Sequence, residues 1–250
     1  MRIVSIFGCG WIGKALIPIL KESYTLKAST RSQRSLEDIP LEDRYILNEN
    51  NDFFHPQFYK TDVVIIAIPP RGAYLETIKA LLNYLRPQTQ IILLSSTSIY
   101  TQTDGILHEN SDKSVKNTSL MLKTERFVEK NHEKTIILRL GGLMGYDRIA
   151  GKYSAGKTLD CDAFVNYIHR DDVVSIIKLM IDKKVSSDLL NVVAPLHPCK
   201  KDIYDKNAQQ FGFDKTLFKE NKILGKQISS DKLKEKYHYH FLKENPLHFW

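Results

Sequence analysis

The stretch RIVSIFGCGWIGKALIPILK, residues 2–21, decides the fold. Its first part, Arg2–Phe7, is a mostly apolar run of the kind that a buried parallel strand shows. Its last part, Ile12–Lys21, has the apolar spacing of a helix in spite of Pro18. The turn between them, Gly8–Gly13, reads Gly-x-Gly-x-x-Gly. A strand, a glycine loop and a helix in this order predict the first unit of a Rossmann sheet, whose loop would hold the pyrophosphate of a dinucleotide.

Each glycine of the loop has a separate purpose in such a site. Gly8 permits the tight turn out of the strand, Gly10 lets backbone N–H groups approach the pyrophosphate, and Gly13 lets the helix pack closely on the strand. The first helical residues, Trp11 and Ile12, then present N–H groups and a partial positive charge to the phosphates. A glycine-rich turn without a ligand is the alternative interpretation.

The rest of the chain alternates apolar runs with amphipathic stretches, which is typical of a parallel sheet covered by helices. We therefore predict an α/β fold, a doubly wound parallel Rossmann sheet in a single domain over residues 1–250, with a small substrate lobe formed by residues 143–165 and 195–250. Further strands are expected at 24–28, 45–47, 62–68, 90–95, 135–140 and 189–193, and helices at 73–85, 119–130, 171–182, 202–212 and 230–236.

Composition narrows the class of protein. The 250 residues include only three cysteines, an odd and sparse set that fits a reducing compartment, and no apolar run approaches the roughly 20 residues of a membrane helix. The net charge is +7, but the lysines are scattered among acids, so an anionic substrate or a phosphorylated cofactor explains the charge without nucleic acid. His238 and His240 lack a third ligand, so no metal site is expected. We expect a cytoplasmic protein that binds neither membranes nor nucleic acid, and pairing of two copies as a homodimer is a further expectation.

The residues after the second strand favour NADP over NAD. An NAD site usually has a carboxylate there to bind the ribose 2′-hydroxyl, but the segment that follows Ala28 has none before Glu37. Arg31 can pair with a 2′-phosphate through its planar guanidinium, and Thr30 and Ser32 can add hydroxyl donors. A solvated surface arginine is the alternative.

A second motif is rejected. Residues 151–158, GKYSAGKT, match the ATP-binding P-loop, but that motif functions between a buried strand and a helix. Neither is expected on its two sides, and the chain already has a dinucleotide loop at Gly8–Gly13.

Several segments together resemble the extended short-chain dehydrogenase/reductase family, of the nucleotide-sugar epimerase and dehydratase type. The resemblance runs over nearly the whole chain and includes the loop Gly8–Gly13. It implies that Ala67, Ile68 and Pro69 pass beside the cofactor and that Ser96 occupies the position of the catalytic serine or threonine. The remaining segments are the serine-rich SSTSIY at 95–100, LRLGGLMG at 138–145 and VNYIHRDDV at 165–173, which is similar to the family's "xNxIHxxDxx" segment.

One departure puts the catalysis in doubt. The family uses Tyr-x-x-x-Lys on the helix after the serine strand, where the lysine lowers the pKa of a tyrosine that acts as general acid and base. No tyrosine occurs between Tyr100 and Tyr146. If Glu125 matches the family's helix glutamate, Asn117 and Met121 stand at the Tyr and Lys places; if Lys123 is the lysine, Ser119 stands at the tyrosine place. The resemblance is therefore to an atypical subgroup that keeps the cofactor fold without this pair.

Two functions remain open. The first is an NADP-dependent oxidoreductase or epimerase-like enzyme on a small, unidentified substrate such as a nucleotide sugar, with Ser96 and Tyr100 as candidate catalytic residues. The second is a non-catalytic NADP-binding sensor or scaffold. Arg139, His169 and Asp172 are expected to be structural.

Overall fold

The computed structural model describes residues 1–51, 53, 55–101, 104–111, 115 and 117–250. The chain divides into two compact units. Unit 1 comprises Met1–Ile99, Asn117–Leu138 and Val174–Leu189, and unit 2 comprises Tyr100–Lys116, Arg139–Val173 and Leu190–Trp250. The predicted lobe segments, 143–165 and 195–250, both fall within unit 2, which also takes in the segment that begins at Tyr100.

The predicted α/β class and parallel Rossmann sheet are confirmed. A seven-stranded parallel sheet has the order β11-β7-β5-β4-β1-β2-β3. Its strands are β1 (Ile3–Phe7), β2 (Thr25–Thr30), β3 (Arg44–Ile46), β4 (Val63–Ile66), β5 (Gln90–Ser96), β7 (Thr135–Leu140) and β11 (Asp188–Val192).

The central strands form the core because both of their faces are covered. β4 is the run Val-Val-Ile-Ile, and all four side chains are fully buried. Val4 and Ile6 of β1 are equally buried, as are Ile91, Ile92 and Leu93 of β5. β-branched side chains suit such a strand because they pack well on a pleated surface that no water reaches. The N–H of Ala67 donates to the carbonyl of Phe7 at 2.8 Å, which brings the ends of β4 and β1 side by side.

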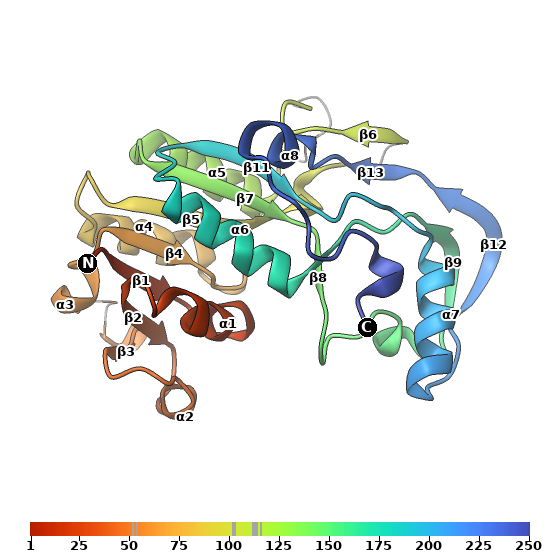
Figure 1. Cartoon of the computed structure of the whole chain (residues 1–250), viewed down its shortest axis with the longest axis horizontal. Coiled ribbons are helices and arrows are strands. Elements are labelled where there is room, and N and C mark those ends of the chain that lie inside the picture. Colours follow the sequence, from red (N-terminus) through yellow and green to blue (C-terminus); the bar gives the residue numbers. More distant parts are fainter. Residues whose placement is uncertain (52, 54, 102–103, 112–114, 116) are drawn as a thin grey trace. The chain divides into compact units, whose positions relative to one another are not determined.

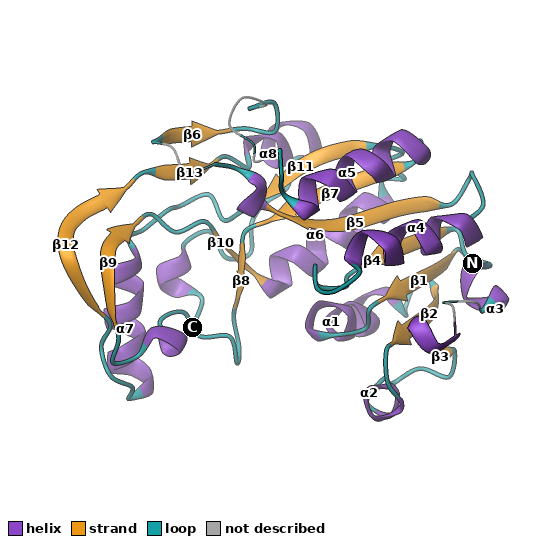
Figure 2. Ribbon diagram, turned by 180° about the vertical axis from the view of Figure 1, so that it is seen from behind, coloured by secondary structure: helices purple, strands orange, loops and turns teal. Residues whose placement is uncertain are grey.

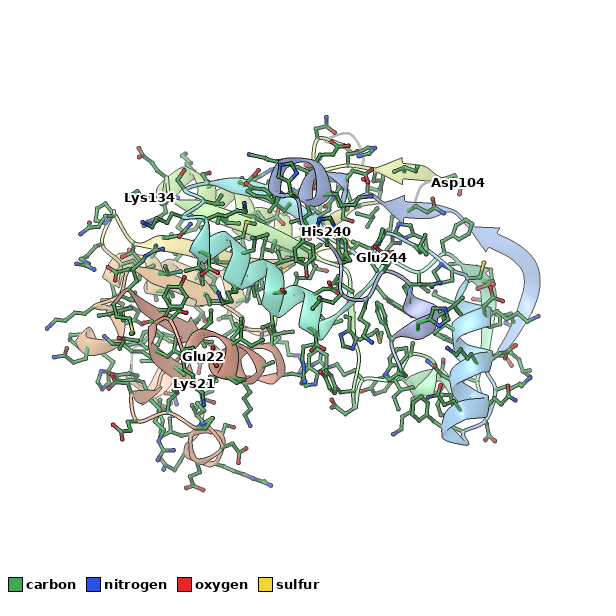
Figure 3. All side chains as sticks on the ribbon, in the orientation of Figure 1. Lys21, Glu22, Asp104, Lys134, His240 and Glu244 are labelled. Carbon is green, nitrogen blue, oxygen red and sulfur yellow. The ribbon has the colours of Figure 1, made fainter. Side chains whose placement is uncertain are left out.

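Helices cover the two faces of the sheet. α4 (Tyr74–Tyr84) and α5 (Leu120–Asn131) pack against each other on one face. α1 (Trp11–Leu20) and α6 (Arg170–Asp182) lie on the other, as Figures 1 and 2 show from opposite sides. The short helices α2 (Gln33–Glu37) and α3 (Pro56–Tyr59) connect the first strands. Lys21 and Glu22, labelled in Figure 3, follow α1 directly.

Unit 2 contains small parallel pairs that the sequence did not predict. β8 (Gly142–Met144) pairs with β10 (Tyr167–His169), β9 (Thr158–Ala163) with β12 (Leu217–Leu224), and β6 (Gly105–Leu107) with β13 (Lys226–Ile228). The predicted helices near its end are present as α7 (Lys200–Phe211) and α8 (Asp231–Tyr237). Asp104, labelled in Figure 3, accepts a hydrogen bond from the N–H of Gly225 at 3.2 Å beside the β6–β13 pair.

The P-loop-like segment has the wrong surroundings for a phosphate site. Gly151 adopts a φ of 90° before the 3-10 turn η4 (Lys152–Ser154), and Thr158 begins strand β9 instead of a helix. The structure therefore agrees with the rejection of this motif. None of the described helices has the length and apolar character needed to cross a membrane.

Candidate functional site

The glycine loop joins β1 to α1, and its three glycines have three different surroundings. Gly8 has a φ of 96°, and a Cβ there would lie 2.6 Å from Ile68 Cγ2. A Cβ on Gly13 would lie 2.9 Å from the carbonyl oxygen of Gly8. A Cβ on Gly10 would meet no atom within 4 Å. The surrounding atoms thus require glycine at positions 8 and 13, whereas packing does not require it at position 10.

A cavity of about 330 Å³ opens at this loop, and all its lining residues belong to unit 1. It lies where the carboxyl ends of neighbouring parallel strands meet, at the point where the chain order of the sheet reverses on the two sides of β1. Open α/β sheets bind their ligands at this place. The lining residues are Phe7, Gly8, Cys9, Gly10, Lys14, Ser29, Thr30, Arg31, Ser35, Leu47, Glu49, Phe53, Ala67, Ile68, Pro69, Arg71, Tyr74 and Thr77.

Most of the residues expected to bind a cofactor line this cavity, and four do not. Those that line it are Gly8, Gly10, Thr30, Arg31, Ala67, Ile68 and Pro69. Ile12 and Gly13 are buried in α1, and Trp11 is its first residue. Ser32 instead caps α2, where its side chain accepts a hydrogen bond from the N–H of Ser35.

The start of α1 is suited to an anion. No side chain caps the helix, and its first turn contains no acidic residue. The first N–H groups of a helix have no partner within the helix, and its dipole adds partial positive charge there. Lys14 and Arg71, two cations that the sequence analysis did not single out, also line the cavity. Lys14 follows the loop directly, one helical turn after Gly10, and the sequence could have indicated it from this position.

Cys9 lies inside the loop as a small buried side chain. Its N–H donates to the carbonyl of Ser29 at 2.7 Å, which joins the ends of β1 and β2. Burial raises the pKa of its thiol to about 11, and the nearby Lys14 only partly opposes this. Because the thiolate is the reactive form, Cys9 is a packing residue.

Arg31 has an acidic neighbour that the sequence analysis missed. Its Nη2 lies 3.1 Å from Glu49 Oε1, and both residues line the cavity. The carboxylate that was absent after β2 is therefore supplied from just beyond β3. The sequence could have indicated Glu49 as a site residue, because parallel strands end at the same edge of a sheet and Glu49 follows the predicted strand 45–47.

The end of β5 carries the two serines of the serine-rich segment, and they face different partners. Ser95 is buried and its Oγ donates to Glu125 Oε1 of α5. Ser96 is half-buried, and its Oγ accepts a hydrogen bond from the N–H of Ser98 at 3.1 Å. The proton of the Ser96 hydroxyl has no acceptor among the residues that the structure describes. Lys123 is exposed on α5, and Met121 is buried there.

Tyr100 lies in unit 2 and is fully buried. Its hydroxyl donates to Asn191 Oδ1 at 2.8 Å and accepts from Arg139 Nη1 at 2.9 Å. The Arg139 guanidinium also lies 5.2 Å from the centre of the Tyr100 ring. Burial raises the pKa of Tyr100, although Arg139 and Asn191 oppose the shift. These contacts tie the phenol into a buried polar cluster.

Asp172, expected to be structural, holds the final segment of unit 2. Its carboxylate accepts hydrogen bonds from the N–H groups of Leu242 and Lys243 and from the hydroxyl of Tyr239. Burial raises its pKa, and these hydrogen bonds act against the rise. No group of three or more His, Cys, Asp or Glu side chains that could hold a metal ion occurs in the described part of the chain.

Comparison with known proteins supports the fold. Protein YeeZ of Escherichia coli (strain K12) is 27% identical over 246 residues, which cover 90% of each chain. A Methylobacillus flagellatus structure, provisionally assigned as an NAD-dependent epimerase/dehydratase, has a TM-score of 0.79 at 19% identity, over 99% of this chain and 96% of that one. The dTDP-glucose 4,6-dehydratase of Bacillus anthracis, in complex with NAD, has a TM-score of 0.75 at 13% identity, over 100% and 95% of the two chains. No protein-family model matches the chain.

The chain has the fold of these epimerases and dehydratases. The resemblance predicted from the motifs is thereby confirmed for the fold. At such low sequence identities, structural similarity does not establish an activity. The function must therefore be argued from the residues of the site.

Proposed function

We propose that this chain binds a nicotinamide dinucleotide in the cavity of unit 1 and acts as an oxidoreductase of the epimerase/dehydratase type. One observation carries the proposal: Gly10 lies on the cavity wall, and a Cβ there would meet no atom within 4 Å. A glycine that packing does not require, at the start of an uncapped helix, is explained by close approach of a pyrophosphate. Lys14 and Arg71 supply the positive charge that two phosphates need.

We assign the cofactor contacts as follows. Gly8, Gly10, Trp11, Ile12 and Gly13 form the pyrophosphate loop. Thr30 and Arg31 lie beside the ribose that carries the 2′ group, with Ser32 next to them as the cap of α2, and Ala67, Ile68 and Pro69 pass beside the cofactor. NADP, which Arg31 favours, remains a prediction, because the dehydratase of known structure holds NAD and Glu49 opposes a 2′-phosphate.

The bound dinucleotide would supply hydride exchange, and the protein must then position the substrate and move one proton. Ser96 fits the first task, because its hydroxyl can donate to a carbonyl or hydroxyl of the substrate while its oxygen accepts from Ser98. For Tyr100 we propose a structural role in place of the acid/base role that the sequence suggested, since Asn191 and Arg139 occupy its hydroxyl. The likeness to a dTDP-glucose dehydratase favours a nucleotide sugar as substrate.

The test is a calorimetric titration with NADH and NADPH, separately, followed by a turnover screen with nucleotide sugars. Micromolar binding of at least one dinucleotide is expected, and absence of binding by both would overturn the proposal. In the screen, Ser96→Ala should lower turnover by about a hundredfold if Ser96 stabilises charge on the substrate. Ser98→Ala, an exposed neighbour, is the matched control and should leave turnover unchanged.

A second function is favoured by one specific observation. α5 (Leu120–Asn131) contains no tyrosine, so the helix that carries the family's acid/base pair lacks its phenol. A non-catalytic sensor or scaffold that responds to the dinucleotide would bind NADH or NADPH in the titration and turn over none of the nucleotide sugars.

A further inference from the structure

Beyond the ends of β2 and β3, the lining of the cavity includes an exposed ion pair between Arg31 and Glu49. We infer that Glu49 is a specificity-determining residue: it holds Arg31 away from a 2′-phosphate and offers a carboxylate to a 2′-hydroxyl, and so lowers the preference of the site for NADP over NAD. This inference rests on the proposed dinucleotide function.

Hydrogen bonds between the ends of β2 and β3 keep the two residues together. The N–H of Leu47 donates to the carbonyl of Thr30 at 2.9 Å, and Asn48 Nδ2 donates to the carbonyl of Arg31 at 2.8 Å. Because these bonds hold the ends of β2 and β3 together in the register of the sheet, Glu49, just beyond β3, lies within reach of Arg31.

The ion pair between Arg31 and Glu49 is exposed enough for a ligand to break it. The side chains of Arg31 and Glu49 are 66% and 57% exposed. An ion pair this exposed contributes little to stability, because water screens the charges and two long side chains must be held in one geometry. A 2′-phosphate, which an arginine can bind with two parallel hydrogen bonds, can therefore reach Arg31, but it must first displace the carboxylate of Glu49.

The two cofactors place opposite demands on the pair. A ribose 2′-hydroxyl donates a hydrogen bond, which Glu49 can accept while it stays beside Arg31. A 2′-phosphate must draw Arg31 from Glu49 and then lie close to a carboxylate of the same sign, which disfavours binding. The same residue therefore assists NAD and opposes NADP.

The experiment compares Glu49→Gln with the wild-type chain, using calorimetric Kd values for NADH and NADPH and for the fragments ADP and 2′,5′-ADP. We expect the preference for NADPH over NADH to rise roughly fivefold or more, with the same sign for the two fragments. The fragments lack the nicotinamide half, so they report on the 2′ position alone.

Asp38→Asn is the matched control. Asp38 Oδ2 lies 3.2 Å from Lys14 Nζ, and its side chain is 65% exposed, so the substitution removes the same charge from a second exposed pair at the cavity. Because Lys14 stands next to the glycine loop, which both cofactors would contact, this variant should change both affinities alike. If Glu49→Gln also changes NADH and NADPH in parallel, the inference is overturned while the proposed function stands. If the wild-type chain binds neither dinucleotide, both are overturned.

Discussion

The cavity of unit 1 and the buried cluster around Tyr100 in unit 2 both contain residues from segments that resemble the dehydrogenase/reductase family, yet they are built differently. In the cavity, Gly10 meets open space and Arg31 is exposed in a weak ion pair. In the cluster, Tyr100 is fully buried, and its hydroxyl is shared between Asn191 and Arg139.

The difference teaches that a motif residue must be judged by its contacts. A polar group that the protein has already paired is expensive to redirect, because its old partners would be left buried and unsatisfied. A group that faces a cavity can take a ligand without that cost. Unit 1 should therefore respond to substitution through ligand affinity, and the Tyr100 cluster through stability.

The largest effect is expected from Gly10→Val. The added side chain would project into the cavity without meeting any protein atom within 4 Å of its Cβ. Dinucleotide affinity should fall by about a hundredfold or more, a loss of roughly 3 kcal/mol. Calorimetric titration checks the affinity, and the melting temperature should stay near that of the wild-type chain. A similar affinity in the two chains would remove the glycine loop from the site.

Arg31→Ala should have the next largest effect. It removes a charged hydrogen bond from the 2′ position, so NADPH binding should weaken by about 1.5–3 kcal/mol and NADH binding by much less. The measurement is the pair of Kd values in the same buffer, since exposed charge interactions depend on salt. Small and equal losses for both cofactors would mean that Arg31 is only a solvated surface residue.

Tyr100→Phe tests the buried cluster around Tyr100 in unit 2. It deletes the hydroxyl that joins Arg139 to Asn191, and it should lower the free energy of unfolding by about 1–3 kcal/mol because buried polar groups lose a partner. Denaturant unfolding measures this loss. Dinucleotide affinity should stay unchanged. Unchanged stability combined with lost turnover would instead return Tyr100 to a catalytic role.

The sequence predicted the sheet well because its strands carry a strong local signal. The buried run Val63–Ile66 and the glycine loop after β1 each define their structure without distant information. The small strands of unit 2 carry no such signal. Gly105 pairs with Lys226, and Leu217 with Thr158, so these pairings depend on partners far along the chain. β8 and β10 have only three residues each, which is too short for a hydrophobic period to show.

The candidate site was predicted in part for the same reason. Gly8, Gly10, Thr30 and Arg31 lie at or just after the ends of strands that could be predicted from the sequence, and all four line the cavity. Glu49 was missed although it follows the predicted strand 45–47, because the sequence does not show that this strand lies beside β2 in the sheet. For Tyr100, the position in the motif is visible in the sequence, whereas the hydrogen bond to Asn191, on which the proposed structural role rests, is not.

The smallest effect expected is a pH dependence from unit 2. Burial lowers the pKa values of His169 and His197 below their ordinary value of 6.5, although Asp171 and the Val165 carbonyl act in the opposite direction. Between pH 6.5 and these lowered values the unfolded chain binds protons that the folded chain does not, so stability must fall as the pH falls through this window. Melting temperatures from pH 7.5 to 5.5 measure the slope of stability against pH.

Replacing His197, whose Nδ1 lies 2.9 Å from the Val165 carbonyl, with Gln should reduce that slope, whereas the Gly10→Val variant should keep it. A stability that does not change between pH 7.5 and 5.5 would show that neither histidine is held neutral by the fold.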